Sequence, residues 1–107
     1  MCGRYASSRR PEDLIEEFDI PIRPDVPRLA PDYNVAPTDP VYAVVEREPK
    51  EEALSPERHL RVLHWGLVPS WSKDAKGAAR MINARVETVA EKPAYRRAFE
   101  RRRCIVP

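Results

Sequence analysis

The fold is decided by the stretch Val41-Tyr42-Ala43-Val44-Val45-Glu46-Arg47-Glu48, which is rich in β-branched and aromatic residues. Such a composition is typical of a β-strand. The stretch from Arg58 to Leu67 alternates, and Leu60, Val62 and His64 share one face at the period of two that a strand imposes. The polar segment between the two stretches is expected to be a solvated hairpin connection. Together they predict a pair of neighbouring strands with a core-facing side.

Helical and extended stretches flank this pair. Pro11 to Phe18 predicts a helix, because proline suits the first turn and the acidic residues after it suit the helix dipole. A second helix is expected from about Pro93 to Arg102, after a short turn. Met81 to Thr88 is expected to be a strand, and Arg103 to Pro107 has the pattern of a strand that is just starting. This mixture predicts an α+β domain built on an antiparallel or mixed sheet.

Length and composition set the broad class. The chain has 107 residues, enough for one small domain, and its net charge of +2 does not by itself indicate a nucleic-acid binder. It has no apolar run long enough to span a membrane, and its polar start predicts no secretory signal. Its two cysteines form neither a metal-ligand spacing nor a disulfide framework. We therefore expect a cytoplasmic protein without a metal, a cofactor or a membrane partner, and the oligomeric state stays open.

Cys2 is the first candidate functional residue, because it directly follows the initiating methionine. A methionine before a small side chain is usually removed, and its removal would leave an α-amine and a thiol on adjacent carbons of Cys2. Such a pair condenses with an aldehyde to an imine, onto which the thiol closes to form a thiazolidine, without any cofactor. Arg4, two residues on, is suited to bidentate contact with a phosphate. A cysteine near a chain end is also commonly a small buried hydrophobe or part of a frayed terminus.

The second candidate is the stretch Asn83-Ala84-Arg85-Val86-Glu87, in which polar and small apolar residues alternate. The amide of Asn83 is suited to orient an imine or a sugar oxygen, and Arg85 is suited to clamp a phosphate. An ordinary amphipathic strand with one wet face explains the same pattern.

Two further stretches carry candidates for contact with nucleic-acid bases. Trp65 and Trp71 flank a turn that contains glycine and proline, and an aromatic ring on a loop rim can stack on an unpaired base. Trp65 is expected in the core, whereas Trp71 fits packing and stacking equally well. In the stretch from Tyr33 to Thr38, Asn34 is expected to be buried and to hold a turn through its side chain. Pro37 could present a flat apolar surface to a base.

Five blocks occur in order along the chain. They are Met-Cys-Gly-Arg-Tyr from residue 1, Tyr-Asn-Val-Ala-Pro-Thr from residue 33, His-Trp-Gly-Leu-Val-Pro-Ser-Trp from residue 64, Ile-Asn-Ala-Arg-Val-Glu-Thr from residue 82 and Arg-Arg-Cys-Ile-Val-Pro from residue 102. In this order they resemble the SRAP family (SOS response-associated peptidase domain), and the resemblance covers essentially the whole chain.

The resemblance implies an α+β fold around a barrel-like sheet with short flanking helices, and a function in the DNA damage response. It implies recognition of abasic sites in single-stranded DNA and a thiazolidine cross-link between Cys2 and the ring-opened sugar aldehyde. By motif position, Asn83 would hold the open sugar or the cross-link. The same correspondence assigns DNA contacts to Arg4 and Arg85 on phosphates, to Pro37 and Trp71 on bases, and to Asn34 near the N-terminal cysteine.

The resemblance stops at Pro107. In the family, the last strand continues into a block with a glutamate, and a later block holds a histidine that assists Schiff-base formation. Neither His59 nor His64 matches that histidine, and Glu87 is not the missing glutamate. We therefore expect residues 1–107 to form the N-terminal part of a single SRAP domain, with a sheet that is incomplete at its C-terminal end.

Three functions are compatible with the sequence. The first is a covalent abasic-site binder with lyase-like Schiff-base chemistry. The second is a thiol peptidase that processes itself, which would require a Cys–His pair. The third is a non-catalytic fragment that binds single-stranded DNA in a salt-sensitive way and ignores the lesion. Whether the chain is an enzyme is therefore open at this point.

Overall fold

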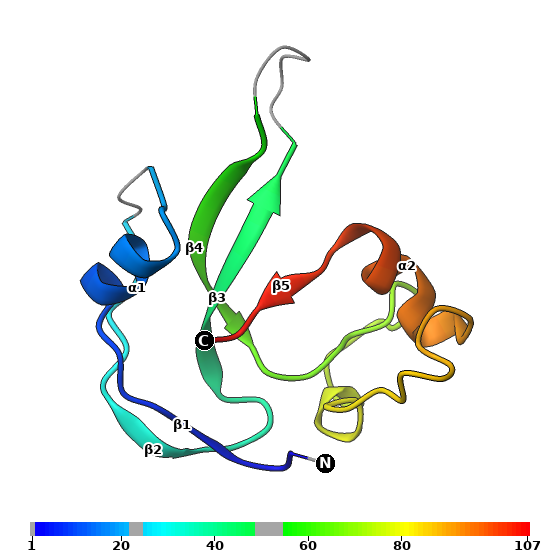
Figure 1. Ribbon diagram of the computed structural model, residues 1–107. Helices are drawn as coiled ribbons and strands as arrows, with labels where there is room; N and C mark the ends of the chain where they lie inside the picture. Colours follow the sequence, from blue (N-terminus) through cyan, green and yellow to red (C-terminus); the bar gives the residue numbers. More distant parts are fainter. Residues whose placement is uncertain (1, 22–24, 49–54) are drawn as a thin grey trace.

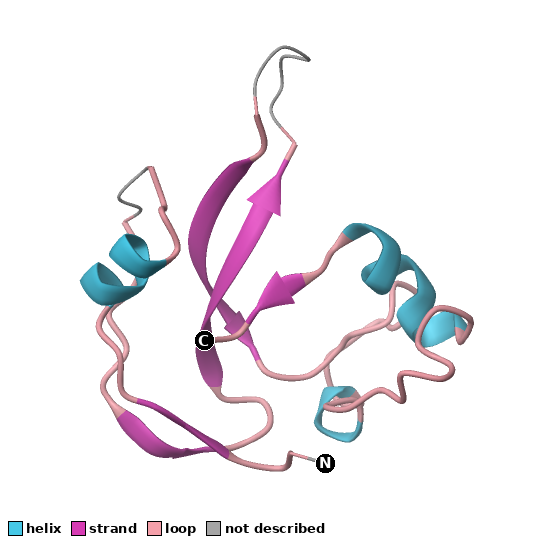
Figure 2. Ribbon diagram, in the orientation of Figure 1, coloured by secondary structure: helices cyan, strands magenta, loops and turns pink. Residues whose placement is uncertain are grey.

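The computed structural model describes residues 2–21, 25–48 and 55–107 of the chain. In chain order its elements are β1 (Tyr5–Ser7), α1 (Pro11–Glu17), β2 (Asp32–Val35), β3 (Pro40–Arg47), β4 (Glu57–His64), the 3-10 helix η1 (Ala78–Arg80), α2 (Pro93–Arg101) and β5 (Cys104–Ile105) (Figures 1 and 2). This mixture confirms the α+β class. Over these residues the strands form two separate antiparallel sheets and do not close into a barrel.

The larger sheet has the strand order β4-β3-β5, with β3 at its centre. Tyr42 on β3 lies opposite Val62 on β4, and Val44 lies opposite both Leu60 on β4 and Ile105 on β5. The predicted strand pair is thus confirmed as an antiparallel hairpin, and the predicted strand near the C-terminal end is confirmed as β5. Residues 49–54 of the predicted hairpin connection lie outside the described residues.

The core lies between one face of this sheet and α1. Leu14 and Ile20 pack with Tyr42, Val44 and Leu60 in a buried cluster. Alternate residues of β3 and β4 contribute to it, because a strand turns every second side chain to the same face. Full burial of one leucine side chain stabilises a fold by about 1.5–3 kcal/mol, so this cluster is the main source of stability in the described residues.

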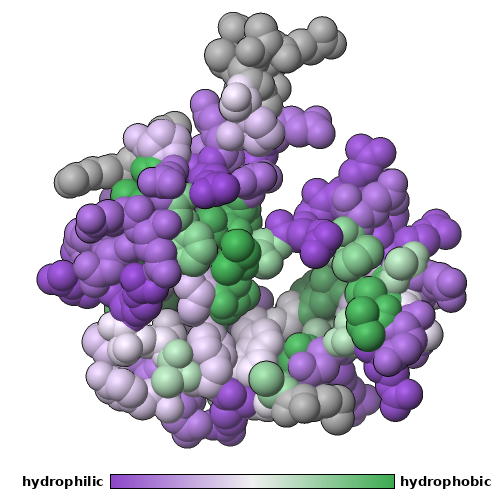
Figure 3. Space-filling model, viewed as in Figure 1, coloured by the Kyte–Doolittle hydropathy of each residue, from purple (hydrophilic) through white to green (hydrophobic). Residues whose placement is uncertain are grey.

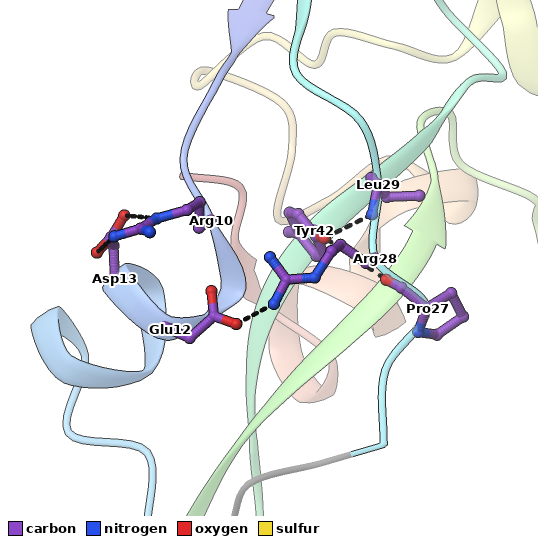
Figure 4. Close-up of polar contacts among 7 residues, drawn as sticks. All are labelled: Arg10, Glu12, Asp13, Pro27, Arg28, Leu29 and Tyr42. Carbon is purple, nitrogen blue, oxygen red and sulfur yellow. Dashed lines mark hydrogen bonds and ion pairs between the residues drawn. The ribbon is translucent and has the colours of Figure 1, made fainter.

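The helix α1 begins as predicted, with Pro11 in its first turn and two acidic residues after it. The segment that follows α1 is fixed against β3 and α1 (Figure 4). The hydroxyl of Tyr42 accepts the N–H of Leu29 at 2.6 Å and donates to the carbonyl of Pro27 at 3.5 Å. Arg28 pairs with Glu12 on α1. The segment between α1 and β2 therefore lies along the core at Pro27 to Leu29, although residues 22–24 lie outside the described residues.

One expectation about the hairpin is wrong. His64 was expected on the core-facing side of its strand, but its side chain is exposed. It is the last residue of β4 and lies opposite Pro40, where the hairpin leaves the core. His59, on the same strand, is half-buried, and its Nε2 lies 3.4 Å from a carboxylate oxygen of Glu57.

The strand predicted from Met81 to Thr88 is also wrong. The segment has no regular structure up to Arg85 and then forms turns, with the N–H groups of Thr88 and Val89 both donating to the carbonyl of Arg85. Alternation alone does not make a strand, because a strand also needs a neighbour to satisfy its backbone groups. The predicted helix after this turn is confirmed as α2, which has Pro93 in its first turn.

Candidate functional site

Cys2 and Asn83 are brought together in space although 81 positions separate them in the chain. The side-chain Nδ2 of Asn83 donates a hydrogen bond to the backbone carbonyl of Cys2 at 2.9 Å. The backbone carbonyl of Asn83 in turn accepts the hydroxyl of Tyr95 on α2 at 3.1 Å. Both Cys2 and Asn83 are exposed to solvent. The contact fixes the backbone of Cys2 while its thiol stays accessible.

The segment that carries Asn83 is attached to the end of β4 by close backbone packing. Gly66 has φ +130°, and a Cβ atom built on it would lie 2.5 Å from the carbonyl oxygen of Ala78. Only glycine permits both this conformation and this approach. One residue later, the N–H of Leu67 donates to the carbonyl of Met81 at 3.0 Å. These contacts determine where the chain continues toward Asn83.

The turn between β2 and β3 is attached to the same end of β4. Thr38 lies in this turn with φ 76°, which is unfavourable for a β-branched residue. Its N–H donates to the carbonyl of Trp65 at 2.8 Å, and the carboxylate of Asp39 accepts the N–H of Ala36 at 2.9 Å. The strained backbone is thus held by hydrogen bonds on both sides, and Pro37 lies within this turn.

Tyr5 connects the N-terminal strand to this site. Its ring meets Trp65 edge to face, with centroids 5.4 Å apart. Trp65 was expected in the core, but it is half-buried and packs against Tyr5 outside the core cluster. The phenolic oxygen of Tyr5 is buried and has no hydrogen-bond partner in the part of the chain that the structure describes. Burial, and after it the negative charge of Asp32, raise the pKa of Tyr5. Tyr5 therefore holds Cys2 and Arg4 close to the end of β4.

The expected role of Asn34 in a turn is wrong. Asn34 is exposed on β2, and its own N–H donates to the side chain of Asp32 at 2.9 Å. The turn after β2 is held instead by the carboxylate of Asp39. Because β1 and β2 pair antiparallel with Tyr5 opposite Val35, Asn34 still lies in the strand beside the N-terminal one.

The other predicted contact residues differ in their exposure to solvent. Arg4 and Arg85 are exposed, Pro37 is half-buried, and Trp71 lies in a turn with 62% of its surface exposed. Within the described ranges, the structure records a direct hydrogen bond to Cys2 only for Asn83. The structure therefore brings Cys2 and Asn83 into contact and leaves the proposed DNA-contacting side chains accessible.

Sequence reasoning missed the residues that position the site. Tyr95 and Asp39 carry no signal of their own, because each acts through one hydrogen bond to a residue that the sequence does not identify as its neighbour. Gly66 could have been singled out as one of only three glycines in the chain. It directly follows Trp65 at the end of a strand pattern, where a glycine is typical of a close approach by another part of the backbone.

The part of the chain that the structure describes contains neither a metal site nor a membrane-spanning helix. No group of three or more histidine, cysteine or acidic side chains there is arranged to hold a metal ion. No helix in the same part of the chain has the length and hydrophobicity needed to cross a membrane.

The chain belongs to the SOS response associated peptidase (SRAP) family, because the model of that family matches residues 1–107. Among curated proteins it is 40% identical over its whole length to the abasic site processing protein YoaM of Bacillus subtilis, of which it covers 44%. It is 36% identical to the abasic site processing protein YedK of Escherichia coli, where 98% of this chain aligns with 44% of that protein. It is 30% identical to the abasic site processing protein HMCES of Xenopus tropicalis, where 99% of this chain aligns with 36% of that protein. The chain thus spans less than half the length of these relatives.

Proposed function

We propose that this chain binds abasic sites in single-stranded DNA and joins them covalently through Cys2 once Met1 has been removed. Met1 lies outside the described residues, so its removal is part of the proposal. The observation that carries the proposal is the hydrogen bond from Asn83 to Cys2, which fixes an exposed N-terminal cysteine beside an exposed amide. The three relatives are all named abasic site processing proteins, which supports the same substrate.

The covalent step follows from the two nucleophiles of Cys2. The neutral α-amine adds to the aldehyde carbon of the ring-opened sugar, and loss of one water leaves an imine. The thiol sulfur then adds to the imine carbon, forming a C–S bond, and the thiol proton ends on the nitrogen of the five-membered ring. The product is a thiazolidine, and the whole sequence releases one water without an oxidant or reductant.

Asn83 is proposed to position both partners of this reaction. Its Nδ2 holds the carbonyl of Cys2, and its Oδ1 has no hydrogen-bond partner among residues 2–21, 25–48 and 55–107. An amide oxygen that is exposed and free in this way can accept a hydrogen bond from a sugar hydroxyl or from the iminium N–H. Asn34, in the neighbouring strand, is proposed to help orient the N-terminus.

The exposed cations and rings are proposed to bind the strand on either side of the lesion. Arg4 and Arg85 suit phosphates, since guanidinium groups form paired hydrogen bonds with phosphate oxygens. Trp71 offers an accessible ring, and stacking of a base on such a ring is worth about 1–3 kcal/mol. Pro37 lies in the turn next to the N-terminal strand. Phosphate contacts carry no sequence information, so little sequence preference is expected beyond the lesion.

We further propose that residues 1–107 are the N-terminal part of a single SRAP domain. The chain covers 44% of YoaM, and β5 pairs with β3 through only two residues. Ile105 and Val106 are about half exposed, and Figure 3 shows hydrophobic surface at the centre of this face, between hydrophilic surfaces over α1 and α2. Further strands beside β5 would cover this apolar surface and complete the sheet.

The decisive experiment is the intact mass of the protein after incubation with an oligonucleotide that bears one abasic site. Protein whose mass already shows loss of Met1 is expected to gain the oligonucleotide mass minus one water. The matched control is Cys104→Ala, which removes the other exposed thiol and should leave the product unchanged, whereas Cys2→Ala should abolish it. Equal cross-linking by Cys2→Ala would overturn the proposal. Binding without any mass shift would favour the non-catalytic DNA binder.

The role of Asn83 has its own test. Asn83→Ala is expected to slow cross-linking about tenfold, which corresponds to loss of a hydrogen bond worth about 1.4 kcal/mol. Its melting temperature should stay close to that of the parent, because Asn83 is exposed. Asn34→Ala is the matched comparison and should slow the reaction less. A rate that is unchanged in Asn83→Ala would contradict the positioning role.

A further inference from the structure

A concave surface lies away from Cys2, between the β3–β4 hairpin and the junction of α2 with β5. Its volume is about 500 Å³, and we call it the arginine hollow. Its charged lining comes from two sides, with Arg47 and Arg61 on the hairpin and Arg101, Arg102 and Arg103 at the α2–β5 junction. Val45 and Leu63 provide apolar surface between them.

The arginine hollow holds all of the excess positive charge of the chain. Five arginines and two glutamates, Glu46 and Glu48, line it. The whole chain has 19 lysines and arginines and 17 acidic residues. Subtracting the lining residues leaves 14 basic and 15 acidic residues, so the remainder of the chain has a net charge of −1. A polyanion would therefore be drawn to this surface in preference to the rest of the chain.

The carboxylates near the hollow neutralise little of this charge. Glu46 is paired with Arg58, which lies outside the hollow, at 2.9 Å. Arg101 pairs with the exposed Glu100 at 3.7 Å, and such an exposed pair is weak. Across the described ranges, the structure records no ion pair for Arg47, Arg61 or Arg102, whereas Arg9, Arg10 and Arg28 each have one.

The backbone directs the arginines of the two sides toward one another. On β4, Arg61 lies opposite Ala43, so it shares a sheet face with Val45 and Arg47, the face opposite the α1 core. Cys104 on β5 pairs with Val45, which places the α2–β5 junction directly beside this face. Arg103 is held by its guanidinium group, which lies 4.8 Å from the ring centroid of Phe99. A restrained cation loses less conformational entropy when it binds.

The arginine hollow lies toward the C-terminal end of β3, whereas β1, the strand that follows Cys2, lies on the side of the molecule where β3 begins (Figure 1). The strand begins at Pro40, next to the turn that is attached to Trp65, and ends at Arg47 in the hollow. Eight residues of strand span about 23 Å at about 3.3 Å per residue. A DNA strand that is bound at Cys2 would need several further nucleotides to reach this surface.

We propose that the arginine hollow binds the phosphate backbone of the DNA strand that extends away from the lesion. All five cations are arginines, whose planar guanidinium group matches phosphate oxygens in paired hydrogen bonds. The inference rests on the proposed DNA partner but not on the covalent step at Cys2. It predicts that strand length beyond the lesion increases affinity through this surface.

The test compares two triple variants of equal charge. Arg47→Gln/Arg61→Gln/Arg102→Gln removes three cations of the hollow for which the described residues provide no ion pair, and Arg9→Gln/Arg10→Gln/Arg28→Gln removes three arginines near α1. Binding of an undamaged, fluorescent 20-nucleotide oligothymidylate is measured by anisotropy at several NaCl concentrations. The hollow variant is expected to bind at least about tenfold more weakly, with the slope of log K against log salt reduced by about 2. The control variant should weaken binding less than about threefold. Equal losses in the two variants would overturn the proposal.

A second measurement locates the DNA without changing the arginines. In a Cys2→Ser background, Cys104 is the remaining thiol, and it lines the hollow. Its alkylation by N-ethylmaleimide should slow at least about fivefold when the oligothymidylate is saturating. An unchanged alkylation rate would place the DNA elsewhere. If poly-glutamate binds as tightly and the hollow variant abolishes that binding too, the occupant is an acidic polypeptide and the DNA assignment fails.

The two proposals fail in different ways. Loss of oligothymidylate binding in the hollow variant supports the hollow even if no cross-link forms at Cys2. Conversely, at saturating concentration of a short abasic oligonucleotide, the hollow variant should cross-link as fully as the parent.

Discussion

The α1–β3–β4 core and the segment from Trp65 to Lys92 are held in different ways. The core buries Leu14, Ile20, Tyr42, Val44 and Leu60 in one apolar cluster. The segment that carries Asn83 includes a single buried residue, Ala78, and is dominated by loops and turns (Figure 2). It is fixed by a few hydrogen bonds and one close approach of backbone. The residues that stabilise the fold and the residues proposed to react or position the reaction therefore lie in different parts of the molecule. Substitutions in the core should mainly lower the free energy of unfolding, and substitutions in the segment that carries Asn83 should mainly slow cross-linking.

The largest expected effect is on the core. Leu60→Ala removes a side chain that is 1% exposed and should lower the free energy of unfolding by about 2–5 kcal/mol. The measurement is urea unfolding followed by far-UV circular dichroism. Leu63→Ala, three residues along the same strand but 39% exposed, is the matched control and should cost less than about 1 kcal/mol. Similar costs at both positions would remove the distinction between core and surface on β4.

The next effect concerns the attachment of the site segment. Gly66→Ala places a Cβ 2.5 Å from the carbonyl oxygen of Ala78 and strains a backbone with φ +130°. We expect a loss of about 1–3 kcal/mol in unfolding free energy and slower cross-linking, since Asn83 would be displaced from Cys2.

Gly77→Ala is the control, because its φ is −81° and a Cβ there meets nothing within 4 Å. It should leave stability unchanged or raise it by up to about 1 kcal/mol. A Gly66→Ala protein with parental cross-linking kinetics would show that the close approach does not position the site.

A smaller effect is expected from the buried hydroxyl of Tyr5. The folded chain has a raised Tyr5 pKa, so the unfolded chain ionises first. The stability linked to neutral Tyr5 is complete below pH about 10 and is lost as the pH rises through the folded pKa. Tyr5→Phe should abolish this alkaline loss and raise stability by up to about 1 kcal/mol at neutral pH, because an unpaired buried hydroxyl is removed.

Tyr33→Phe is the control for this change, because Tyr33 is 77% exposed. Urea midpoints from neutral pH to pH about 11 would distinguish the two variants. If Tyr5→Phe is clearly less stable than the parent, its hydroxyl has a favourable partner.

The smallest effect is expected from the ion pairs around the core. Backbone hydrogen bonding, and after it the hydrogen bond from Arg28, lower the pKa of Glu12. The stabilisation is therefore present above the unfolded pKa of about 4.3 and is lost as the pH falls through the folded pKa. Because Glu12 is exposed, Glu12→Gln should shift the urea midpoint only slightly at neutral pH and not at all at high salt. A large shift at high salt would mean that the core depends on this pair as well as on apolar packing.

The sequence by itself determined the elements whose patterns are local. The strands β3 and β4 and the helices α1 and α2 were predicted, because side-chain alternation, β-branching and proline at a helix start act within a few residues. The reactivity of Cys2 toward an aldehyde was also predicted from the sequence, because it depends only on the position of this cysteine directly after Met1.

Only the tertiary structure decided what lies beside what. The stretch from Met81 to Thr88 alternates like a strand but pairs with no strand among the described residues. His64 fits the alternation of core-facing residues, but it is exposed because it lies at the end of β4, beyond the core. The hydrogen bond from Asn83 to Cys2 spans 81 positions of the chain. Gly66 approaches Ala78 from a different element. The arginines of the hollow come from both the β3–β4 hairpin and the α2–β5 junction. Such contacts depend on how complete elements pack, and the period of a single stretch contains no information about its partner.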